Sequence, residues 1–350
     1  MKTIVIMAGG TGGHIFPGLA VAHEMRSAGW EVVWMGVRGG MEERLVPPRG
    51  YETAWIRARA ARGKGLLQKA LLPANLLLSF WESARHLRRI RPNVVLGLGG
   101  YVAFPGGMMA SLLNRPLALH EQNAVAGLAN RVLSTVSDKV MVAFPGSLQK
   151  AEWTGNPVRT DIAAMAPPEA RFAGRTGPLH ILVVGGSLGA QALNEIMPRA
   201  VALLADKPHV VHQSGEKHLD ALKQHYAEAG VQGELVAFID DMAKRYAQAD
   251  LVICRAGAVT VAELCAGGMP SILVPFPHAV DDHQTANARF LADAGAALLV
   301  PQKSLTAQGL AALIRSLDRV RLLDMAKKAR ALGKPDAARV VAQRCMEIAR

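Results

Sequence analysis

Residues 3 to 14 read Thr3-Ile4-Val5-Ile6-Met7-Ala8-Gly9-Gly10-Thr11-Gly12-Gly13-His14. The run up to Met7 is rich in β-branched residues, which is typical of a buried strand. The four glycines that follow predict a tight turn, and a helix is expected over residues Pro17 to Ser27. A strand, a glycine-rich turn and a helix in this order indicate the start of a parallel α/β domain.

The same pattern returns near the midpoint of the 350-residue chain. There His180 to Val184 leads into Gly185-Gly186-Ser187-Leu188-Gly189-Ala190, and a helix is expected over Gln191 to Leu204. Between the two copies, Pro167-Pro168 and the stretch Gly174 to Pro178 are rich in residues that break helices and strands, as interdomain linkers are. A chain of this length also exceeds what one hydrophobic core normally supports. We therefore expect two domains.

The fold class predicted is α/β, with two doubly wound, Rossmann-like parallel sheets that face each other across a cleft and bind ligands at the carboxyl ends of their strands. A further helix is expected after Met41. The other expected strands cover residues 31–35, 94–98, 117–120, 139–143, 210–213, 235–238, 251–254, 271–274 and 297–300.

Composition excludes several classes of protein. Half of the residues are apolar and only 5% are aromatic, which argues against a disordered or fibrous chain. The three cysteines are too few for a disulfide framework and too far apart for a zinc knuckle, so a reducing compartment fits best. The apolar run at the start ends at Gly9 and is too short for a signal peptide.

The net charge of +12 is concentrated in residues 38–92, which carry twelve Lys and Arg against four Glu. Within this stretch, Gly65 to Trp81 is rich in leucine but too interrupted to span a bilayer. Such a segment suits the interface of an anionic membrane surface, with leucines buried and cations on headgroups. The alternative is a helix buried in its own domain with a basic outer face. No nucleic-acid partner is expected, because there is no recognised binding module and few aromatic residues.

Two glycine-rich loops are candidate anion cradles. The loop Gly9 to Gly13 and the loop Gly185 to Gly189 both present backbone N–H groups at a helix start, which suits phosphate or sugar hydroxyls. Neither contains a Walker lysine, and the first lacks the third glycine of the dinucleotide fingerprint. His14 follows the first loop, where a neutral imidazole can act as a general base, or else cap the helix or orient a substrate.

Three more polar stretches are candidates. His120-Glu121-Gln122-Asn123 ends a strand, and loop function is expected there. The stretch Arg255 to Glu263 puts glycine and small residues at a helix start, and Glu263 lies about one turn into that helix. A carboxylate there can accept hydrogen bonds from both hydroxyls of a ribose, or it can complement the helix N-terminus. The stretch Pro275 to Asn287 holds His278, Asp281, Asp282 and His283, whose spacing disfavours a metal site and favours substrate contacts.

Together these pieces resemble the MurG family of bacterial glycosyltransferases, which have the GT-B fold. The resemblance covers most of the chain in order. The stretches that carry it are residues 9–14, Gly97-Leu98-Gly99-Gly100-Tyr101, residues 120–123, Gly155-Asn156-Pro157-Val158-Arg159, residues 185–187, Phe238-Ile239-Asp240-Asp241-Met242 and residues 260–263. It departs from the family at Leu188, where the family has glutamine, and in the loop His278 to Asn287, which is one residue longer.

The resemblance implies inverting transfer of N-acetylglucosamine from UDP-N-acetylglucosamine to the 4-hydroxyl of undecaprenyl-diphosphate-linked muramyl-pentapeptide, the lipid I to lipid II step of peptidoglycan synthesis. It implies no cofactor and no metal. The implied base is His14, and the implied acceptor residues are Tyr101, Glu121 and Gln122. The implied donor-binding residues are Thr11, Gly12, Gly13, Asn123, Arg159, Ser187 (diphosphate), Ile239 (uracil), Ala258, Val259, Thr260, Val261, Ala262, Glu263 (ribose) and Gln284 (sugar).

The resemblance further implies a peripheral protein at the cytoplasmic face of the inner membrane. Residues 1–160 would form the acceptor and membrane-docking domain, with a C-terminal helix at about 335–350 packed back on it, and residues 161–334 would bind the UDP-sugar. Three alternatives remain: another lipid-directed glycosyltransferase that uses a UDP-sugar, a UDP-sugar epimerase, and a noncatalytic protein that binds the sugar nucleotide at a membrane.

Overall fold

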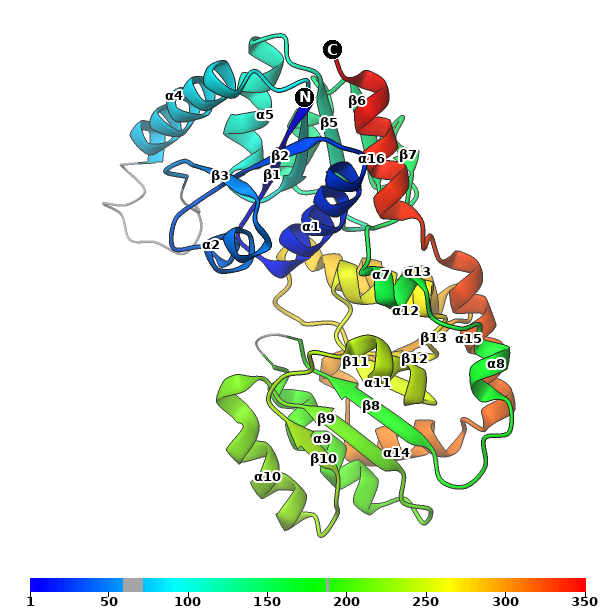
Figure 1. Ribbon diagram of the computed structural model, residues 1–350. Helices are drawn as coiled ribbons and strands as arrows, with labels where there is room; N and C mark the ends of the chain where they lie inside the picture. The colour runs from blue at the N-terminus through cyan, green and yellow to red at the C-terminus, as the bar shows by residue number, and fades with distance from the viewer. Residues whose placement is uncertain (59–71, 187–188) are drawn as a thin grey trace. The chain divides into compact units, whose positions relative to one another are not determined.

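A computed structural model describes residues 1–58, 72–186 and 189–350 of the chain (Figure 1). The described residues form two compact units. The first comprises Met1–Arg159 and Pro335–Arg350, and the second comprises Thr160–Lys334. The predicted apolar segment therefore falls partly outside the described residues, over 65–71, and so do Ser187 and Leu188.

The first unit is built on a seven-stranded sheet with the order β3-β2-β1-β4-β5-β6-β7, in which every neighbouring pair is parallel. Its strands are β1 (Thr3–Ala8), β2 (Glu31–Gly36), β3 (Glu52–Trp55), β4 (Val94–Gly99), β5 (Leu117–Glu121), β6 (Lys139–Val142) and β7 (Glu152–Trp153). The strand order reverses between β1 and β4, so this is the switch point at which parallel sheets bind ligands.

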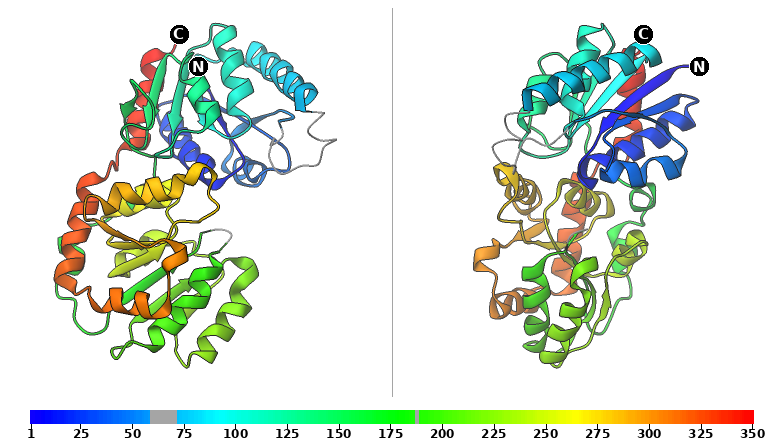
Figure 2. Two further views of the ribbon diagram at one scale, coloured as in Figure 1. Left: turned by 180° about the vertical axis from the view of Figure 1, so that it is seen from behind. Right: turned by 90° about the vertical axis from the view of Figure 1, so that its left-hand side faces the viewer.

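Both faces of this sheet are covered by helices (Figure 2). Residues Ile4 and Ile6 of β1 face a core shared with α1 (Gly12–Ser27) and α16 (Ala337–Ile348). Residues Val5 and Met7 face the opposite core. The helices on that second face are α4 (Leu72–Ile90), α5 (Ala103–Leu112) and α6 (Leu128–Leu133), while α2 (Met41–Leu45) and η1 (Pro47–Arg49) follow β2. The alternation is the period-two pattern of a strand buried on both sides.

The last helix returns to the first unit and is fastened there. The side chain of Asn93 accepts a hydrogen bond from Thr3 N at 2.8 Å and donates one to Arg350 O at 2.6 Å. Arg344 of α16 donates through Nε to both carboxylate oxygens of Glu152, each at 2.9 Å. The two ends of the chain are therefore held at the same edge of one unit.

The second unit contains a six-stranded parallel sheet with the order β10-β9-β8-β11-β12-β13. Its strands are β8 (His180–Val184), β9 (His209–Gln213), β10 (Glu234–Val236), β11 (Leu251–Cys254), β12 (Ser271–Leu273) and β13 (Ala297–Leu299). Its helices are α7 (Thr160–Ala163), α8 (Pro168–Phe172), α9 (Gln191–Ala202), α10 (Leu219–Glu228), α11 (Met242–Gln248), α12 (Ala258–Gly267), α13 (His283–Ala292), α14 (Ala307–Arg315) and α15 (Arg319–Leu332), with η2 (Glu216–His218), η3 (Val280–Asp282) and η4 (Gln302–Ser304).

Three expectations about elements need correction. Helix α1 begins at Gly12, five residues before Pro17, because Thr11 O accepts the first bonds from His14 N and Ile15 N. Strands β3 and β7 were not predicted. Both lie at sheet edges and are only partly buried, so their sequences lack a continuous apolar run.

No helix in the described parts of the chain is long and apolar enough to cross a membrane.

One buried carboxylate, that of Asp250, joins several segments of the second unit at the amino ends of its strands. Asp250 is fully buried and pairs with Arg175 at 2.6 Å and with Arg319 at 3.0 Å. Burial alone would raise the pKa of Asp250, but hydrogen bonds from His180 N, Arg175 and Arg319 lower it below the ordinary value of 3.8. The stability that these bonds contribute is therefore present above pH 3.8 and is lost as the pH falls below it.

We predict that Asp250→Ala lowers the free energy of unfolding of the chain by about 3 to 5 kcal/mol, because two arginines lose their buried counter-ion. Asp324→Ala is the control, because Asp324 pairs with Lys328 at 2.6 Å on the exposed surface of α15. We expect that change to cost less than about 0.5 kcal/mol. Urea unfolding measures the free energy of unfolding of both variants. Equal losses would show that the buried ion pairs of Asp250 stabilise the chain no more than the exposed pair does.

Candidate active site

The first candidate site lies where β1 and β4 end. Gly99 and Gly100 have φ angles of 110° and 78°, and Gly10 has a φ of 88°, which are conformations that favour glycine. A Cβ atom on Gly100 would lie 2.2 Å from Gly9 O, so the backbones after β1 and β4 are in direct contact. Only glycines allow this close approach of the two backbones.

Two side chains contact the loop after β1. The hydroxyl of Tyr101 lies 2.9 Å from where a Cβ of Gly10 would be, so its ring covers that glycine. Glu42, which is fully buried, accepts from Gly10 N at 3.2 Å and from Val37 N at 3.1 Å. Sequence analysis missed Glu42, because it belongs to no motif. The only signal was Gly40, where a Cβ would lie 2.5 Å from Glu42 Oε2 and would therefore exclude the carboxylate.

His14 stands on the first turn of α1 with its ring against the β4 loop. A Cβ on Gly99 would lie 2.8 Å from His14 Cε1 and 2.9 Å from Nδ1, so the ring packs directly on that glycine. The Nδ1 atom of His14 is 2.8 Å from Gln122 Oε1. The imidazole is only partly buried. It is thus fixed on one side and open to solvent on another.

The hydrogen bonds continue from Gln122 into the core. Gln122 Nε2 donates to His120 O at 2.8 Å and lies 3.1 Å from His120 Nδ1. His120 Nε2 in turn lies 2.8 Å from Gly155 O. His120 is fully buried, and this burial lowers its pKa to about 4. The ring of His120 is therefore neutral at physiological pH.

The side chain of Glu121 is also buried. It is 2% exposed, and its oxygens accept from Asn123 N at 2.9 Å and from Asn130 Nδ2 at 2.8 Å. Gln122 is 1% exposed. As expected, this polar stretch ends a strand, since His120 and Glu121 are the last residues of β5. The expectation that its polar side chains are exposed is wrong for His120, Glu121 and Gln122, because all three are buried. Only Asn123 is partly exposed.

The other predicted residues of the first unit surround this network. Thr11 is exposed, and Gly12 and Gly13 are partly exposed at the start of α1. Arg159 is partly exposed at the end of the buried stretch 154–158, which contains the Gly155 carbonyl that His120 contacts. Thr11, Gly12 and Gly13 therefore follow the carboxyl end of β1 and Asn123 follows that of β5, whereas Arg159 comes after β7 in the chain.

The second glycine-rich loop is also held by close backbone contacts. Gly186 and Gly189 have φ angles of 84° and 77°, and a Cβ on Gly189 would lie 2.1 Å from Ser214 O. Gln213 Nε2 donates to Gly186 O at 3.0 Å and to Ala237 O at 3.1 Å. Gln213 therefore joins this loop to the segment that contains Ile239. Sequence analysis did not single out Gln213, whose position at the end of β9 was its only signal.

The start of α12 carries the residues predicted for the nucleotide. Glu263 is 7% exposed and accepts from Tyr246 Oη at 3.5 Å. The residues before it in this helix alternate in burial. Ala258 and Val261 are buried, whereas Val259, Thr260 and Ala262 are partly exposed.

Gln284 and Ile239 lie at neighbouring loops of the same unit. Gln284 Oε1 accepts from Phe276 N at 2.9 Å and from Ala256 N at 3.3 Å, so the amide braces the loops after β11 and β12. The side chain of Ile239 is 5% exposed, whereas its neighbour Phe238 is 54% exposed.

A cavity of about 390 Å³ opens at this end of the second sheet. It is lined by the start of α9, where the Glu195 carboxylate accepts from Gln191 Nε2 at 2.8 Å, and by His218, Arg255, Phe276 and Gln302. The guanidinium of Arg255 donates to Val274 O and to Gln302 Oε1, and burial lowers its pKa. A cation beside a helix start and a glycine loop makes this cavity suited to an anionic ligand.

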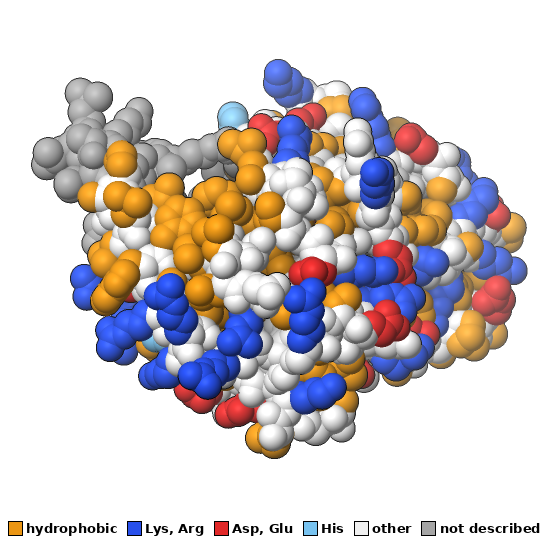
Figure 3. Space-filling view, turned by 90° about the horizontal axis from the view of Figure 1, so that it is seen from above, with side chains coloured by type: hydrophobic (Ala, Val, Ile, Leu, Met, Phe, Trp, Pro, Cys, Tyr) orange, Lys and Arg blue, Asp and Glu red, His pale blue; other side chains and the backbone are white. Residues whose placement is uncertain are grey.

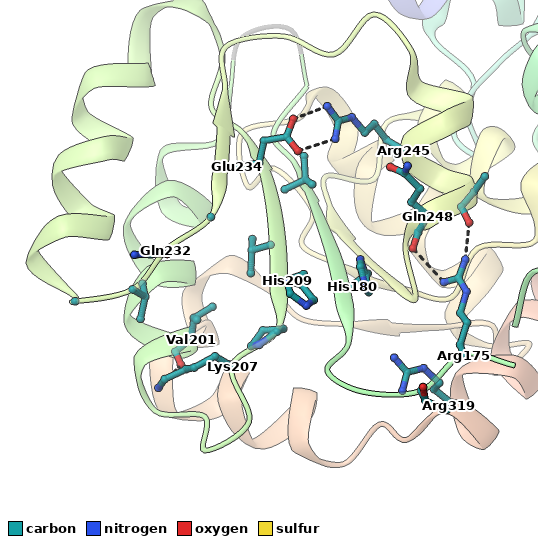
Figure 4. Close-up of a pocket in the computed structure, with 18 residues that line it drawn as sticks. Arg175, His180, Val201, Lys207, His209, Gln232, Glu234, Arg245, Gln248 and Arg319 are labelled. Atoms are coloured by element: carbon teal, nitrogen blue, oxygen red, sulfur yellow. Dashed lines mark hydrogen bonds and ion pairs between the residues drawn. The ribbon is translucent and has the colours of Figure 1, made fainter.

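A larger cavity, of about 1080 Å³, lies at the opposite end of the same sheet (Figure 4). It is lined by His180 and His209, which begin β8 and β9. Its arginines are paired with carboxylates, Arg175 and Arg319 with Asp250 and Arg245 with Glu234. The bonds of Arg255 in the smaller cavity go instead to neutral acceptors. Size alone therefore does not make it the active site.

The loop before α13 shows no arrangement for a metal. Asp281 and Asp282 adopt φ angles of 52° and 50°, and Asp282 accepts from Thr285 Oγ1 at 2.7 Å. Among the residues that the structure describes, no three His, Cys, Asp or Glu side chains come close enough together to hold a metal ion.

Comparison with known proteins identifies the family of both units. Residues 4–142 match the glycosyltransferase family 28 N-terminal domain, and residues 180–341 match the family's C-terminal domain. The chain is 67% identical over 351 aligned residues to a UDP-N-acetylglucosamine--N-acetylmuramyl-(pentapeptide) pyrophosphoryl-undecaprenol N-acetylglucosamine transferase of Aromatoleum aromaticum, with 100% of this chain and 98% of that protein covered. A protein of the same name from Dechloromonas aromatica is 62% identical, with 100% and 99% covered.

The crystal structure of Acinetobacter baumannii MurG has a similar fold. The TM-score is 0.89 at 41% sequence identity, and the match covers 99% of this chain and 100% of that one. The predicted fold class of two parallel-sheet α/β domains is thereby confirmed. The chain belongs to glycosyltransferase family 28.

Proposed function

We propose that the chain transfers N-acetylglucosamine from UDP-N-acetylglucosamine to undecaprenyl-diphosphate-linked muramyl-pentapeptide, a step of peptidoglycan synthesis. The observation that carries the proposal is full-length similarity to transferases named for this reaction. The site geometry supports it, because an imidazole and two glycine-rich loops stand at the ligand-binding ends of two parallel sheets.

The donor is proposed to bind mainly on the second unit. The diphosphate would lie at the glycine loop after β8, where helix α9 begins beside the cavity near Arg255. Glu263 would accept hydrogen bonds from the ribose, and the segment around Ile239, which Gln213 braces, would meet the uracil. Gln284 would reach the sugar through its amide nitrogen, because its oxygen is bonded to the protein backbone. Asn123, Arg159 and residues 11–13 would complete the donor site.

His14 is proposed as the general base. The 4-hydroxyl oxygen of the acceptor forms the new bond to the anomeric carbon, its proton passes to His14, and the bond from that carbon to the diphosphate breaks with UDP leaving. Backbone N–H groups, helix N-termini and Arg159 would stabilise the charge that develops on the departing diphosphate. Tyr101 remains our proposed acceptor contact, since its side chain is 42% exposed beside Gly10. The burial of Glu121 and Gln122 favours a role in shaping the site.

The second face of the first unit is proposed to dock on an anionic membrane, the cytoplasmic face of the inner membrane. Large hydrophobic side chains are exposed on three helices of that face: Leu76, Leu77 and Trp81 on α4, Leu112 on α5, and Leu128 and Val132 on α6. Figure 3 shows hydrophobic side chains gathered in one area, with Lys and Arg along an edge of it. The exposed Arg85, Arg88 and Arg89 of α4 supply cations for anionic headgroups.

The proposal is tested by transfer of radiolabelled N-acetylglucosamine from its UDP donor to a short-chain analogue of the lipid-linked muramyl-pentapeptide. We expect transfer, and we expect it to persist with a chelator, because cationic and backbone groups of the chain would neutralise the leaving diphosphate. Binding of the UDP-sugar without transfer would refute the proposed acceptor. Loss of activity on chelation would refute the metal-independent mechanism.

His14→Ala and Glu263→Ala should affect different steps. We expect His14→Ala to lower kcat by about 10² to 10⁴ while the Kd for UDP-N-acetylglucosamine stays within about twofold, because only proton transfer is lost. Glu263→Ala should instead raise that Kd by about 10- to 100-fold, because charged hydrogen bonds to the ribose disappear. Calorimetry and steady-state rates separate the two effects. Unchanged turnover in His14→Ala would defeat its assignment as base.

Membrane docking is tested by co-sedimentation with vesicles of phosphatidylcholine, with and without phosphatidylglycerol. We expect binding to require the anionic lipid and to weaken in salt. The double variant Leu77→Ser with Trp81→Ser should weaken binding at least about tenfold, since two large apolar side chains leave the bilayer. Val320→Ser in the second unit is the control, because Val320 is 79% exposed on α15. Equal binding by all three proteins would exclude this face as the docking surface.

A further inference from the structure

We infer that Gln122 and His120 are positioning residues that fix the tautomer of His14, so that His14 holds its proton on Nδ1 and its lone pair on Nε2. The inference rests on the proposed role of His14 as base. It adds two residues to that role and names the atom that would take the proton. It follows from three consecutive contacts, each of which constrains the next.

The chain of constraints begins at Gly155. A backbone carbonyl only accepts hydrogen bonds, so the His120 Nε2 atom 2.8 Å from Gly155 O must carry a hydrogen. Burial lowers the pKa of His120 to about 4, so its ring is neutral at physiological pH. A neutral imidazole with a hydrogen on Nε2 has a lone pair on Nδ1. His120 Nδ1 is therefore an acceptor.

The second constraint orients the amide of Gln122. The Nε2 atom of Gln122 faces two acceptors, His120 O at 2.8 Å and His120 Nδ1 at 3.1 Å. With the amide reversed, its oxygen would face a carbonyl oxygen and a lone pair, and both contacts would be repulsive. Gln122 is 1% exposed, so no solvent compensates for that reversal. The amide oxygen must therefore point toward His14.

The third constraint sets the tautomer of His14. Its Nδ1 lies 2.8 Å from Gln122 Oε1, which only accepts, so Nδ1 carries the hydrogen. In the neutral ring the lone pair then belongs to Nε2. The ring cannot shift toward β4, because it packs on Gly99. Within the described parts of the chain no hydrogen bond engages Nε2 of His14, so it is the ring nitrogen left to act on a hydroxyl.

Gln122 and His120 touch no reacting atom, but through this arrangement they affect the proton transfer that His14 performs. The hydrogen bond made by one ring nitrogen decides which state the other nitrogen has, and a base with the wrong tautomer presents a hydrogen where a lone pair is needed. With Gln122 replaced by an apolar residue, both neutral tautomers of His14 become accessible. The fraction of molecules that are competent for proton transfer then falls.

The first experiment measures the tautomer directly in the full chain. Nitrogen-15 NMR of chain labelled at histidine should show a protonated-type shift at His14 Nδ1 and a lone-pair-type shift at Nε2, with the signals assigned by their loss in His14→Gln. A hydrogen on Nε2 in the unmodified chain would overturn the inference. This measurement needs no substrate. If the chain fails to transfer the sugar, the proposed function fails while the tautomer is still decided.

The second experiment uses Gln122→Met, which keeps the volume but removes the acceptor. We expect the His14 signals to move toward the opposite tautomer, and kcat to fall about 10- to 100-fold with the Kd for UDP-N-acetylglucosamine unchanged. His120→Leu should shift the signals in the same direction by a smaller amount, because Gln122 still donates to the backbone of residue 120. Unchanged signals and unchanged kcat in Gln122→Met would contradict the inference.

His212→Leu is the matched control for His120→Leu. His212 is likewise fully buried and neutral, since burial lowers its pKa to about 3, but it bonds to Tyr226 Oη and Asn194 Oδ1 in the second unit. Both substitutions should lower the Tm, and only His120→Leu should alter the His14 signals. An equal change of those signals in both variants would show a general effect of lost stability and would refute the positioning role.

Discussion

The contact between two backbones, one after β1 and one after β4, is the constraint on which the first site depends. A Cβ atom on Gly100 would lie 2.2 Å from Gly9 O, so these two segments can meet only where both lack side chains. Helix α1 begins at Gly12, directly after this contact, and the ring of His14 on its first turn packs against Gly99. Tyr101 and Glu42 then cover the loop from outside and inside. Glycines here therefore position side chains as well as opening room for a ligand.

The second unit meets the same requirement with different groups. Its glycine loop after β8 approaches the end of β9, where a Cβ on Gly189 would lie 2.1 Å from Ser214 O. The buried Gln213 spans from this loop to the segment before Ile239. In the first unit the buried carboxylate of Glu42 performs the comparable task of holding loop N–H groups. A parallel sheet with open glycine loops thus needs a buried polar brace, because short loops cannot satisfy all of their own backbone groups.

The sequence predicted the two sheets and their loops well, because buried parallel strands are continuous apolar runs and glycine turns mark their carboxyl ends. The prediction missed the partly buried strands β3 and β7. It also began the first helix too late, because Pro17, which lies inside α1, was predicted to be its first residue. The residues of the candidate site were predicted through resemblance and local motifs. Glu42 and Gln213 were missed, because their roles arise from contacts across 32 and 27 residues of chain that no local pattern encodes.

The run His120 to Asn123 shows most clearly what sequence alone cannot decide. Four adjacent polar residues at a strand end suggest exposure, yet His120, Glu121 and Gln122 are buried because each finds partners within the fold. A buried polar group without a partner costs stability, so burying three requires that their bonds be mutually consistent. That consistency leaves one orientation for Gln122 and one tautomer for His120. The hydrogen bonds that make the burial tolerable are thus the same ones that determine the chemical state of His14.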